Sequence, residues 1–163
     1  MKTVINTIKL QIDAKSCNES FARTAVASFA AQLDPTIDEI NDLKTAVSEA
    51  VTNCIVHSNS KTVLIEASLW RNDREEAVTK KPTKILTEKY QCGIAIAITD
   101  FGTGIANIEK ALEPFYTTKP DQERSGMGFT VMQSFMDSLK VTHAKPSGTI
   151  VQMTKTFNNC AGA

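Results

Sequence analysis

A long amphipathic helix is the strongest structural signal in the chain. Thr36 is followed three residues later by Glu39, which is the spacing of a capping box at a helix start. Beyond this cap, apolar residues recur at the spacing of one helical face: Ile40, Leu43, Val47, Ala50, Val51 and Cys54. A helix with one apolar face must bury that face, so the chain needs a second layer of structure.

A shorter helical pattern precedes this helix. Ser16 or Asn18 can supply its N-cap, and the apolar positions that follow are Phe21, Ala25, Val26, Phe29, Ala30 and Leu33. The pattern stops at Asp34-Pro35, because proline restricts the residue before it. The sequence therefore predicts two neighbouring helices that share a buried side.

The other layer is predicted to be a sheet. Residues 8–12 alternate between apolar and polar, residues 62–69 and 91–99 are rich in strand-forming side chains, and residues 141–143 and 149–156 form a closing pair. Short helices are expected at 108–112 and 130–139, a loop at 113–124 and a solvated hairpin end at 71–89. We predict one α+β domain over residues 1–163, with helices covering one face of a mixed, mostly antiparallel sheet.

Charge and cysteine content exclude several classes of function. The chain carries 18 Lys and Arg against 18 Asp and Glu, which argues against direct binding of nucleic acid. Its longest apolar run, residues 94–98, is too short to cross a membrane, and no secretory signal is visible. Four cysteines without a CxxC pair and two histidines do not make a zinc site. We expect a cytoplasmic protein with reduced thiols.

Glu49 and Asn53 form the first candidate site. They are four residues apart on the long helix, so both project from one face. A carboxylate and an amide placed together can hold a cation or a metal-bound water. The alternative is a solvated polar pair without a ligand.

Residues 100–105, with the sequence DFGTGI, form the second candidate site. Asp100 follows a buried strand and can accept a hydrogen bond from a purine amino group, while Gly102 and Gly104 let the backbone approach a flat ring. The spacing is not that of a dinucleotide-binding fingerprint. The alternative is a tight turn without a ligand.

Residues 124–130, with the sequence RSGMGFT, form the third candidate site. A glycine-rich loop that opens a helix presents free N–H groups and the positive end of the helix dipole, which suits phosphate oxygens. It is not a Walker A motif, because no Gly-Lys-Ser/Thr follows. The alternative is an ordinary loop.

Taken in this order, the three sites resemble the N-box, G1-box and G2-box of the GHKL ATPase and kinase superfamily, whose ATP-binding domain is a two-layer sandwich called the Bergerat fold. Gly148-Thr149 resembles its fourth element, a threonine that supports the adenine-binding aspartate. A closer resemblance, to the anti-sigma F factor family of endospore-forming bacteria, spans nearly the whole chain. It is carried by residues 18–23 (NESFAR), 27–36 (ASFAAQLDPT), 48–53 (SEAVTN), 115–120 (FYTTKP) and 123–130 (ERSGMGFT).

The chain departs from this family at two places. His57-Ser58-Asn59 stands where the family has His-Gly, and the charged segment 71–89 is longer than expected. Sensor histidine kinases share the ATP-binding fold, but they carry their phosphate-accepting histidine on a separate domain. We therefore interpret His57 as a packed histidine rather than a phosphate acceptor.

The resemblance implies a set of roles for individual residues. Glu49 would be the general base, Asn53 would hold Mg²⁺, and Arg124 would contact the γ-phosphate. Residues 117–125 would form a lid over the nucleotide. The full set of implied ATP-binding residues is Asn53, Asp100, Gly102, Gly104, Ile105, Thr117, Thr118, Lys119, Arg124, Ser125, Gly126, Met127, Gly128, Thr130 and Thr149.

The resemblance also implies partners. A homodimer would hold a sporulation sigma factor inactive and would phosphorylate an anti-anti-sigma protein on serine, using ATP. Arg23 on the first helix would contact a partner, although a solvated arginine is equally compatible with the sequence. Two alternatives remain open: a stress-response anti-sigma kinase of the sigma B type, and a nucleotide-dependent binding module that transfers no significant phosphate.

Overall fold

The computed structural model describes residues 2–72, 91–116, 126–158 and 160. Its sheet has five strands in the order β1-β2-β3-β5-β4. The strands are β1 (Lys2–Asp13), β2 (Thr62–Asn72), β3 (Gln91–Asp100), β4 (Ser138–His143) and β5 (Thr149–Phe157). All four neighbouring pairs are antiparallel. The predicted α+β fold with a mostly antiparallel sheet is confirmed.

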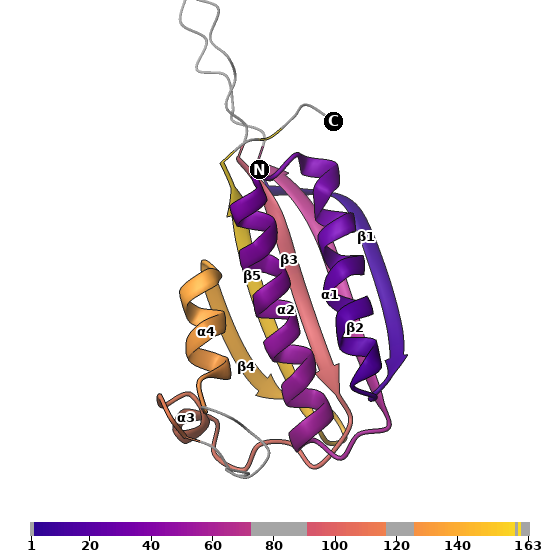
Figure 1. The fold of residues 1–163 in the computed structure, drawn as a ribbon, viewed down its shortest axis with the longest axis vertical. Coiled ribbons are helices and arrows are strands. Elements are labelled where there is room, and N and C mark those ends of the chain that lie inside the picture. Colours follow the sequence, from indigo (N-terminus) through magenta and orange to yellow (C-terminus); the bar gives the residue numbers. More distant parts are fainter. Residues whose placement is uncertain (1, 73–90, 117–125, 159, 161–163) are drawn as a thin grey trace, which may run out of the picture.

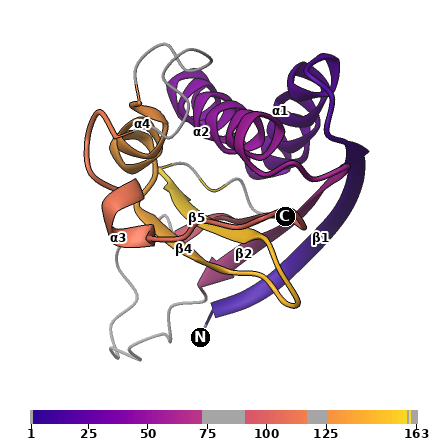
Figure 2. The same ribbon diagram turned by 90° about the horizontal axis from the view of Figure 1, so that it is seen from below.

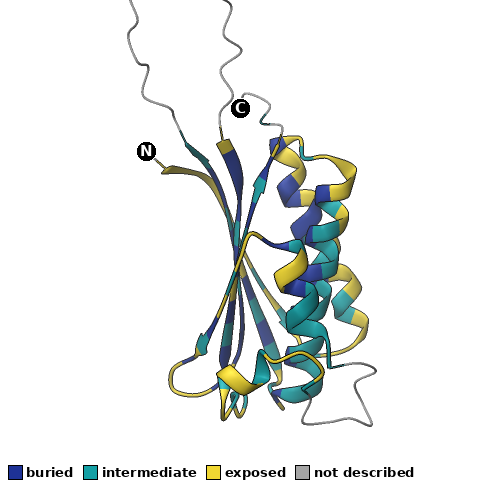
Figure 3. Ribbon diagram, turned by 90° about the vertical axis from the view of Figure 1, so that its left-hand side faces the viewer, coloured by how far each residue is buried: buried dark blue, intermediate teal, exposed yellow. Residues whose placement is uncertain are grey.

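Helices α1 (Cys17–Ala30), α2 (Ile37–His57) and α4 (Gly128–Phe135) lie on one face of the sheet (Figures 1 and 2). A short 3₁₀ turn, η1 (Ala31–Leu33), continues α1, and α3 (Ile108–Ala111) lies near the start of α4. Figure 3 shows the two layers edge-on, with the buried residues where helices and sheet meet. Within the described part of the chain, no helix is both long and apolar enough to span a bilayer.

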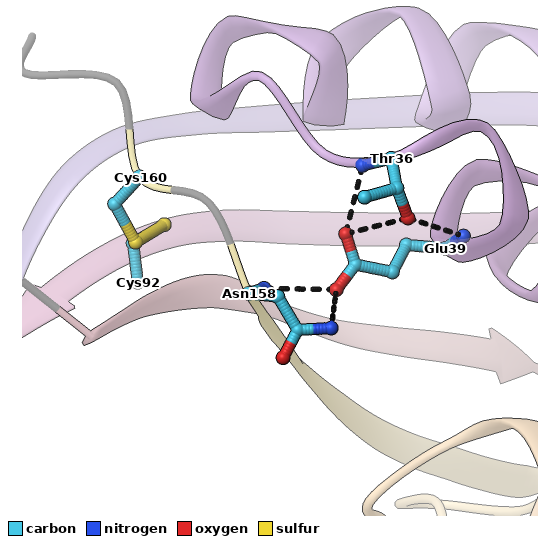
Figure 4. Close-up of a disulfide and its surroundings, with 5 residues drawn as sticks. All are labelled: Thr36, Glu39, Cys92, Asn158 and Cys160. Carbon is cyan, nitrogen blue, oxygen red and sulfur yellow. Dashed lines mark hydrogen bonds between the residues drawn. A yellow bond between two sulfur atoms is a disulfide. The ribbon is translucent and has the colours of Figure 1, made fainter. Parts of the chain in front are cut away.

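The predicted capping box starts α2. The Thr36 hydroxyl accepts a hydrogen bond from the Glu39 N–H (3.2 Å), and Glu39 Oε2 accepts one from the Thr36 N–H (2.8 Å). The other Glu39 oxygen accepts two more from Asn158, from its backbone N–H (2.8 Å) and its side-chain Nδ2 (2.9 Å) (Figure 4). One buried carboxylate therefore joins the start of α2 to the chain just after β5.

The core lies between α1 and α2 on one side and the middle of the sheet on the other. Leu43, Val47 and Val51 of α2 are fully buried, as are Ile65 of β2 and Ile94 of β3. The predicted buried face of α1 is wrong at its start, because Phe21 is 57% exposed and Ala22 is buried in its place. The rest of the predicted stripe is buried as expected at Val26, Phe29, Ala30 and Leu33.

The helix predicted over 130–139 is shorter than expected. It ends at Phe135, Met136 is already extended, and Leu139 belongs to β4. Asp137 pairs with β5 instead: its N–H donates to the Thr154 carbonyl (2.9 Å), and its carboxylate accepts from the Thr156 N–H (2.7 Å). These bonds to a neighbouring strand replace the last turn of the expected helix.

The expectation that all thiols are reduced is wrong for two cysteines. Cys92 of β3 and Cys160 form a disulfide with Cα atoms 5.8 Å apart (Figure 4). Cys92 lies opposite Phe157 in the β3–β5 register, so the chain leaving β5 passes the start of β3. Cys17 is free and exposed, and Cys54 is free and buried. In the charged segment 71–89, Arg71 and Asn72 end β2, and the rest of the predicted hairpin end lies outside the described residues.

Candidate functional site

A cavity of about 310 Å³ lies where α2, the turn after β3, the start of α4 and the start of β5 meet. This volume is at the lower end of the range for small-molecule sites. Its lining combines all three sequence clusters: Asn53, Cys54, His57, Ser58, Asp100, Thr103, Gly104, Ile105, Ala106, Asn107, Ala111, Tyr116, Gly126, Gly128, Phe129, Thr149 and Val151. Segments far apart in the sequence thus form one site.

A larger hollow of about 820 Å³ lies on the sheet face opposite the helices. Its floor carries the small residues Ala95 and Ala97, and the Lys9–Glu66 ion pair (3.1 Å) stands at its side with both partners exposed. We place the functional site in the smaller cavity, because buried polar groups converge there.

Asp100 is the buried acid of the cavity. It ends β3 and is 3% exposed, and its Oδ1 accepts a hydrogen bond from the Gly102 N–H (3.0 Å). The hydroxyl and backbone N–H of Thr149 also donate to this carboxylate. Burial raises the pKa of Asp100 above its ordinary value, and the three hydrogen bonds oppose that rise. The result is a fixed acceptor group, with lone pairs left for a ligand donor such as an exocyclic amino group.

Two glycines let the backbone close around Asp100. A β-carbon on Gly148, where φ is +113°, would lie 2.0 Å from the Asp100 carbonyl oxygen. A β-carbon on Gly102 would lie 1.6 Å from the Ser58 carbonyl oxygen, which already accepts a hydrogen bond from the Thr103 N–H (2.9 Å). Because any side chain would collide with backbone at either position, the turn after β3 requires Gly102 and the turn before β5 requires Gly148.

Glu49 and Asn53 of α2 both face the start of α4. A β-carbon on Gly128 would lie 3.2 Å from Glu49 Oε2 and 3.3 Å from both terminal atoms of Asn53. Gly128 is the first residue of α4, and the side chain of the preceding Met127 makes no capping hydrogen bond. The first N–H groups of α4 have no partner inside their own helix, so they suit an anion held beside Asn53.

The donor set also fits a small divalent cation. Among the described residues, no group of three or more His, Cys, Asp or Glu side chains is placed to hold a metal. Mg²⁺ needs only one or two protein oxygens when phosphates and waters complete its octahedron. The side-chain oxygen of Asn53 can supply that ligand.

The remaining predicted residues divide into three groups. Gly126 (φ +61°), Gly104 (φ +72°), Ile105 and Thr149 line the cavity with Asn53, Asp100 and Gly128. Gly102, Met127 and Thr130 adjoin it without lining it. Thr117, Thr118, Lys119, Arg124 and Ser125 lie outside the described residues, so their roles stay predictions.

Arg23 lies on α1 and does not line the cavity. Its guanidinium is 3.6 Å from Glu19 Oε1 and donates to the Ser20 hydroxyl at 3.5 Å. Glu19 also accepts a hydrogen bond from Ser48 of α2 (2.5 Å), so this polar cluster joins α1 to the helix that carries Glu49.

Sequence reasoning missed several residues that line the cavity. Cys54 was assigned to the core, and burial does raise its pKa, which keeps the thiol neutral and suits contact with an apolar ring. The Ser58 hydroxyl donates a hydrogen bond to the Cys54 carbonyl (2.5 Å). The Ser58 carbonyl accepts one from the Thr103 N–H, in the turn after β3. Tyr116 and Phe129 also line the cavity, and Phe129 directly follows Gly128, so an aromatic residue next to a glycine could have suggested contact with a ligand ring. His57 also lines the cavity at the end of α2.

Comparisons with known proteins agree with this geometry. The family described as "Histidine kinase-like ATPase domain" matches residues 13–155. The anti-sigma F factor of Clostridium beijerinckii (strain ATCC 51743 / NCIMB 8052) is 51% identical over 153 residues, covering 94% of this chain and 96% of the relative. That of Caldanaerobacter subterraneus subsp. tengcongensis (strain DSM 15242 / JCM 11007 / NBRC 100824 / MB4) is 51% identical over 150 residues, covering 92% and 93%.

A more distant structural similarity also exists. The mycobacterial sensor histidine kinase MprB aligns with 93% of this chain and 99% of its own, at 16% identity and a TM-score of 0.48. The family assignment does not need it, because the sequence matches span nearly the whole chain. The chain belongs to the family of histidine kinase-like ATPase domains and, within it, to the anti-sigma F factors.

Proposed function

We propose that this protein binds ATP and Mg²⁺ in the cavity and is an anti-sigma factor that uses the bound ATP to phosphorylate a partner on serine. The observation that carries the proposal is the meeting of Asn53 and Gly128 in the cavity that also holds the buried Asp100, with the Glu49 carboxylate beside the same glycine. An acceptor for adenine, the N–H groups at the start of α4 for phosphates and an amide for Mg²⁺ then meet at one cavity.

Each group has a defined task in this proposal. Asp100, held by Gly102 and Thr149, accepts a hydrogen bond from the adenine amino group. The first N–H groups of α4 bind phosphate oxygens, and Asn53 binds the Mg²⁺ that neutralises their charge. Ile105 and Phe129 line the wall that shields the ligand from water. Thr117, Thr118, Lys119, Arg124 and Ser125 belong to the proposed lid, with Arg124 on the γ-phosphate.

Glu49 is the proposed general base. It takes the proton of the serine hydroxyl as the serine oxygen bonds to the γ-phosphorus and the bond from that phosphorus to the ADP oxygen breaks. Its carboxylate lies against the first residue of α4, on the phosphate side of the cavity. Such a reaction depends mainly on positioning and charge neutralisation, which a site built between two packed helices supplies.

The proposed partners follow the names of the relatives, which are anti-sigma F factors. A homodimer of this chain holds a sporulation sigma factor of the sigma F type inactive in the cytoplasm, and its substrate is the anti-anti-sigma protein. Arg23 on α1 is the proposed partner contact. Two alternatives are a sigma B type partner and binding without significant phosphate transfer. The test below distinguishes them by which sigma factor is captured and by whether serine is labelled.

The test mixes the purified protein with γ-labelled ATP, Mg²⁺ and a candidate anti-anti-sigma protein. We expect label on a serine of the partner, together with ATP-dependent capture of a sigma F type factor. Capture of the sigma factor without label on serine would contradict the kinase and favour the binding module. Capture of only a sigma B type factor would favour the stress-response alternative.

A further inference from the structure

One lysine is buried where α2, α4 and β5 meet. Lys155 of β5 is 8% exposed. Its ammonium group donates to the carbonyl oxygen of Phe135, the last residue of α4, at 2.7 Å, and to Asp42 Oδ2 of α2 at 3.0 Å. Lysine is seldom this buried unless its charge is paired, so the arrangement depends on both partners.

The same two helices meet again at the proposed phosphate site. Gly128 begins α4 beside Glu49 and Asn53, whereas Phe135 ends it beside Lys155 and Asp42. Asp42 precedes Glu49 on α2, so α4 runs antiparallel to α2, as Figure 1 shows for the two ribbons, and lies near α2 at both of its ends. At ~1.5 Å per residue, the seven steps from Gly128 to Phe135 separate these two contacts by only ~10 Å.

The C-terminal end of α4 explains why a cation, Lys155, is placed there. Met136 is extended, so the last carbonyl groups of α4 lack partners within the helix, and a cation there suits the negative end of the helix dipole. An apolar side chain could fill the same space but could not bond the Phe135 carbonyl and Asp42 at once. The ammonium group therefore fixes both the position and the tilt of α4 relative to α2.

We propose that Lys155, paired with Asp42, is a positioning residue for the phosphate-binding half of the ATP site. It sets the distance between the first N–H groups of α4 and the Glu49–Asn53 pair without touching the nucleotide. The polar groups of the adenine half, Asp100 and Thr149, come from β3 and β5, and α4 adds to the cavity wall only through Gly128 and Phe129 at its start. This inference rests on the proposed function, because it assigns the two halves of the site to two parts of ATP.

The test compares two ligands on each variant. Dissociation constants for ATP with Mg²⁺ and for adenosine are measured by NMR titration of the full chain, for wild type, Lys155→Met and Asp42→Asn. Lys9→Met is the matched control, because Lys9 also pairs with a carboxylate, Glu66, but both are exposed on the opposite face of the sheet. Partial unfolding of a variant lowers the concentration of folded binding sites for both ligands equally, so the ratio of the ATP and adenosine dissociation constants stays unchanged. A changed ratio therefore reports a shift of the phosphate site and not a loss of stability.

We expect Lys155→Met to weaken ATP binding on the order of tenfold while the affinity for adenosine changes much less. Asp42→Asn should also weaken ATP binding more than adenosine binding, but to a smaller extent. If Lys155→Met does not fold, the Asp42→Asn result tests the positioning role instead. Lys9→Met should change neither constant. Equal changes for both ligands, or none, would overturn the positioning role and leave the proposed function intact. Failure of the wild type to bind ATP would instead overturn the proposed function itself.

Discussion

Asp100 and Glu49 are two carboxylates with different surroundings: Asp100 lines the cavity, whereas Glu49 lies beside Gly128 and is not part of the lining. Asp100 is buried and receives hydrogen bonds from Gly102 and Thr149, so its orientation is fixed. Glu49 projects from α2 toward the first residue of α4. A fixed, hydrogen-bonded acid suits recognition, and an acid beside the phosphate site suits proton transfer. Two variants separate these tasks.

Glu49→Gln is expected to abolish phosphate transfer while ATP binding persists. The amide cannot take a proton at neutral pH, so the transfer rate should fall by about 10²- to 10⁴-fold. Removing a negative charge beside the phosphates should leave ATP affinity unchanged or raise it. The rate of partner phosphorylation and the ATP affinity by calorimetry are measured on the same sample.

Glu66→Gln, an exposed glutamate of β2, is the matched control and should keep full activity. Undiminished phosphorylation in Glu49→Gln would refute the assignment of the base.

Asp100→Asn is expected to weaken ATP binding by roughly tenfold to a hundredfold. The amide turns one acceptor atom into a donor, yet Gly102, Thr149 and the adenine amino group all donate at this point. Calorimetric titration with ATP measures the dissociation constant for Asp100→Asn and for wild type. Asp137→Asn, which alters an acid on the β4 side of the sheet, should leave the affinity unchanged.

The raised pKa of Asp100 sets how fold stability and adenosine affinity depend on pH. Because the folded-state pKa lies above that of the unfolded chain, protonation of Asp100 stabilises the fold, and this contribution disappears as pH rises through the folded pKa. The ionised form accepts adenine, so adenosine affinity should fall as pH is lowered through the same range. Constant affinity across that range would argue against a ligand bond to Asp100.

At the scale of elements, α2 is held at its start by bonds that reach across the fold. The Glu39 carboxylate both caps the helix and binds Asn158 beyond β5. Two residues later, Cys160 is bonded to Cys92 of β3. The chain after β5 is thus fastened to both layers, at the end of the sheet away from the cavity (Figures 1 and 4).

Cys160→Ser is expected to lower the free energy of unfolding of the oxidised protein by about 2–4 kcal/mol. The disulfide closes a loop between residues 68 apart, and such a crosslink restricts the unfolded chain. Thermal unfolding with and without reductant measures the effect. Wild type in reductant should match the variant, and Cys17→Ser, at an exposed free thiol, should change nothing. Equal midpoints for oxidised wild type and Cys160→Ser would contradict a stabilising disulfide.

Sequence predicted the elements well where the signal is local. The Thr36–Glu39 capping box and the alternation of the strands depend on neighbours in the chain, and the structure has both. Phe21, the end of α4 and the disulfide were predicted wrongly, because each depends on contacts between distant segments. The acid and glycines of the site were found from motifs and resemblance. Cys54 and Ser58 were not, because only the folded turn brings them to the cavity.

At the scale of the molecule, the two layers place the cavity at one end of the sheet. The turn after β3, the start of β5, the end of α2 and the start of α4 meet there, and the strand pairing brings Thr149 beside Asp100. The sheet positions the proposed adenine half, and the packing of α4 on α2 positions the proposed phosphate half. In the proposed function, both halves must therefore bind one ligand.

Calorimetric titration of the purified full-length chain with ATP tests this requirement most directly. With Mg²⁺ present, we predict one binding site per chain, with affinity that falls when Mg²⁺ is removed by chelation and falls again in Asp100→Asn. Absence of any heat of binding for ATP with Mg²⁺, from protein shown to be folded, would contradict the account.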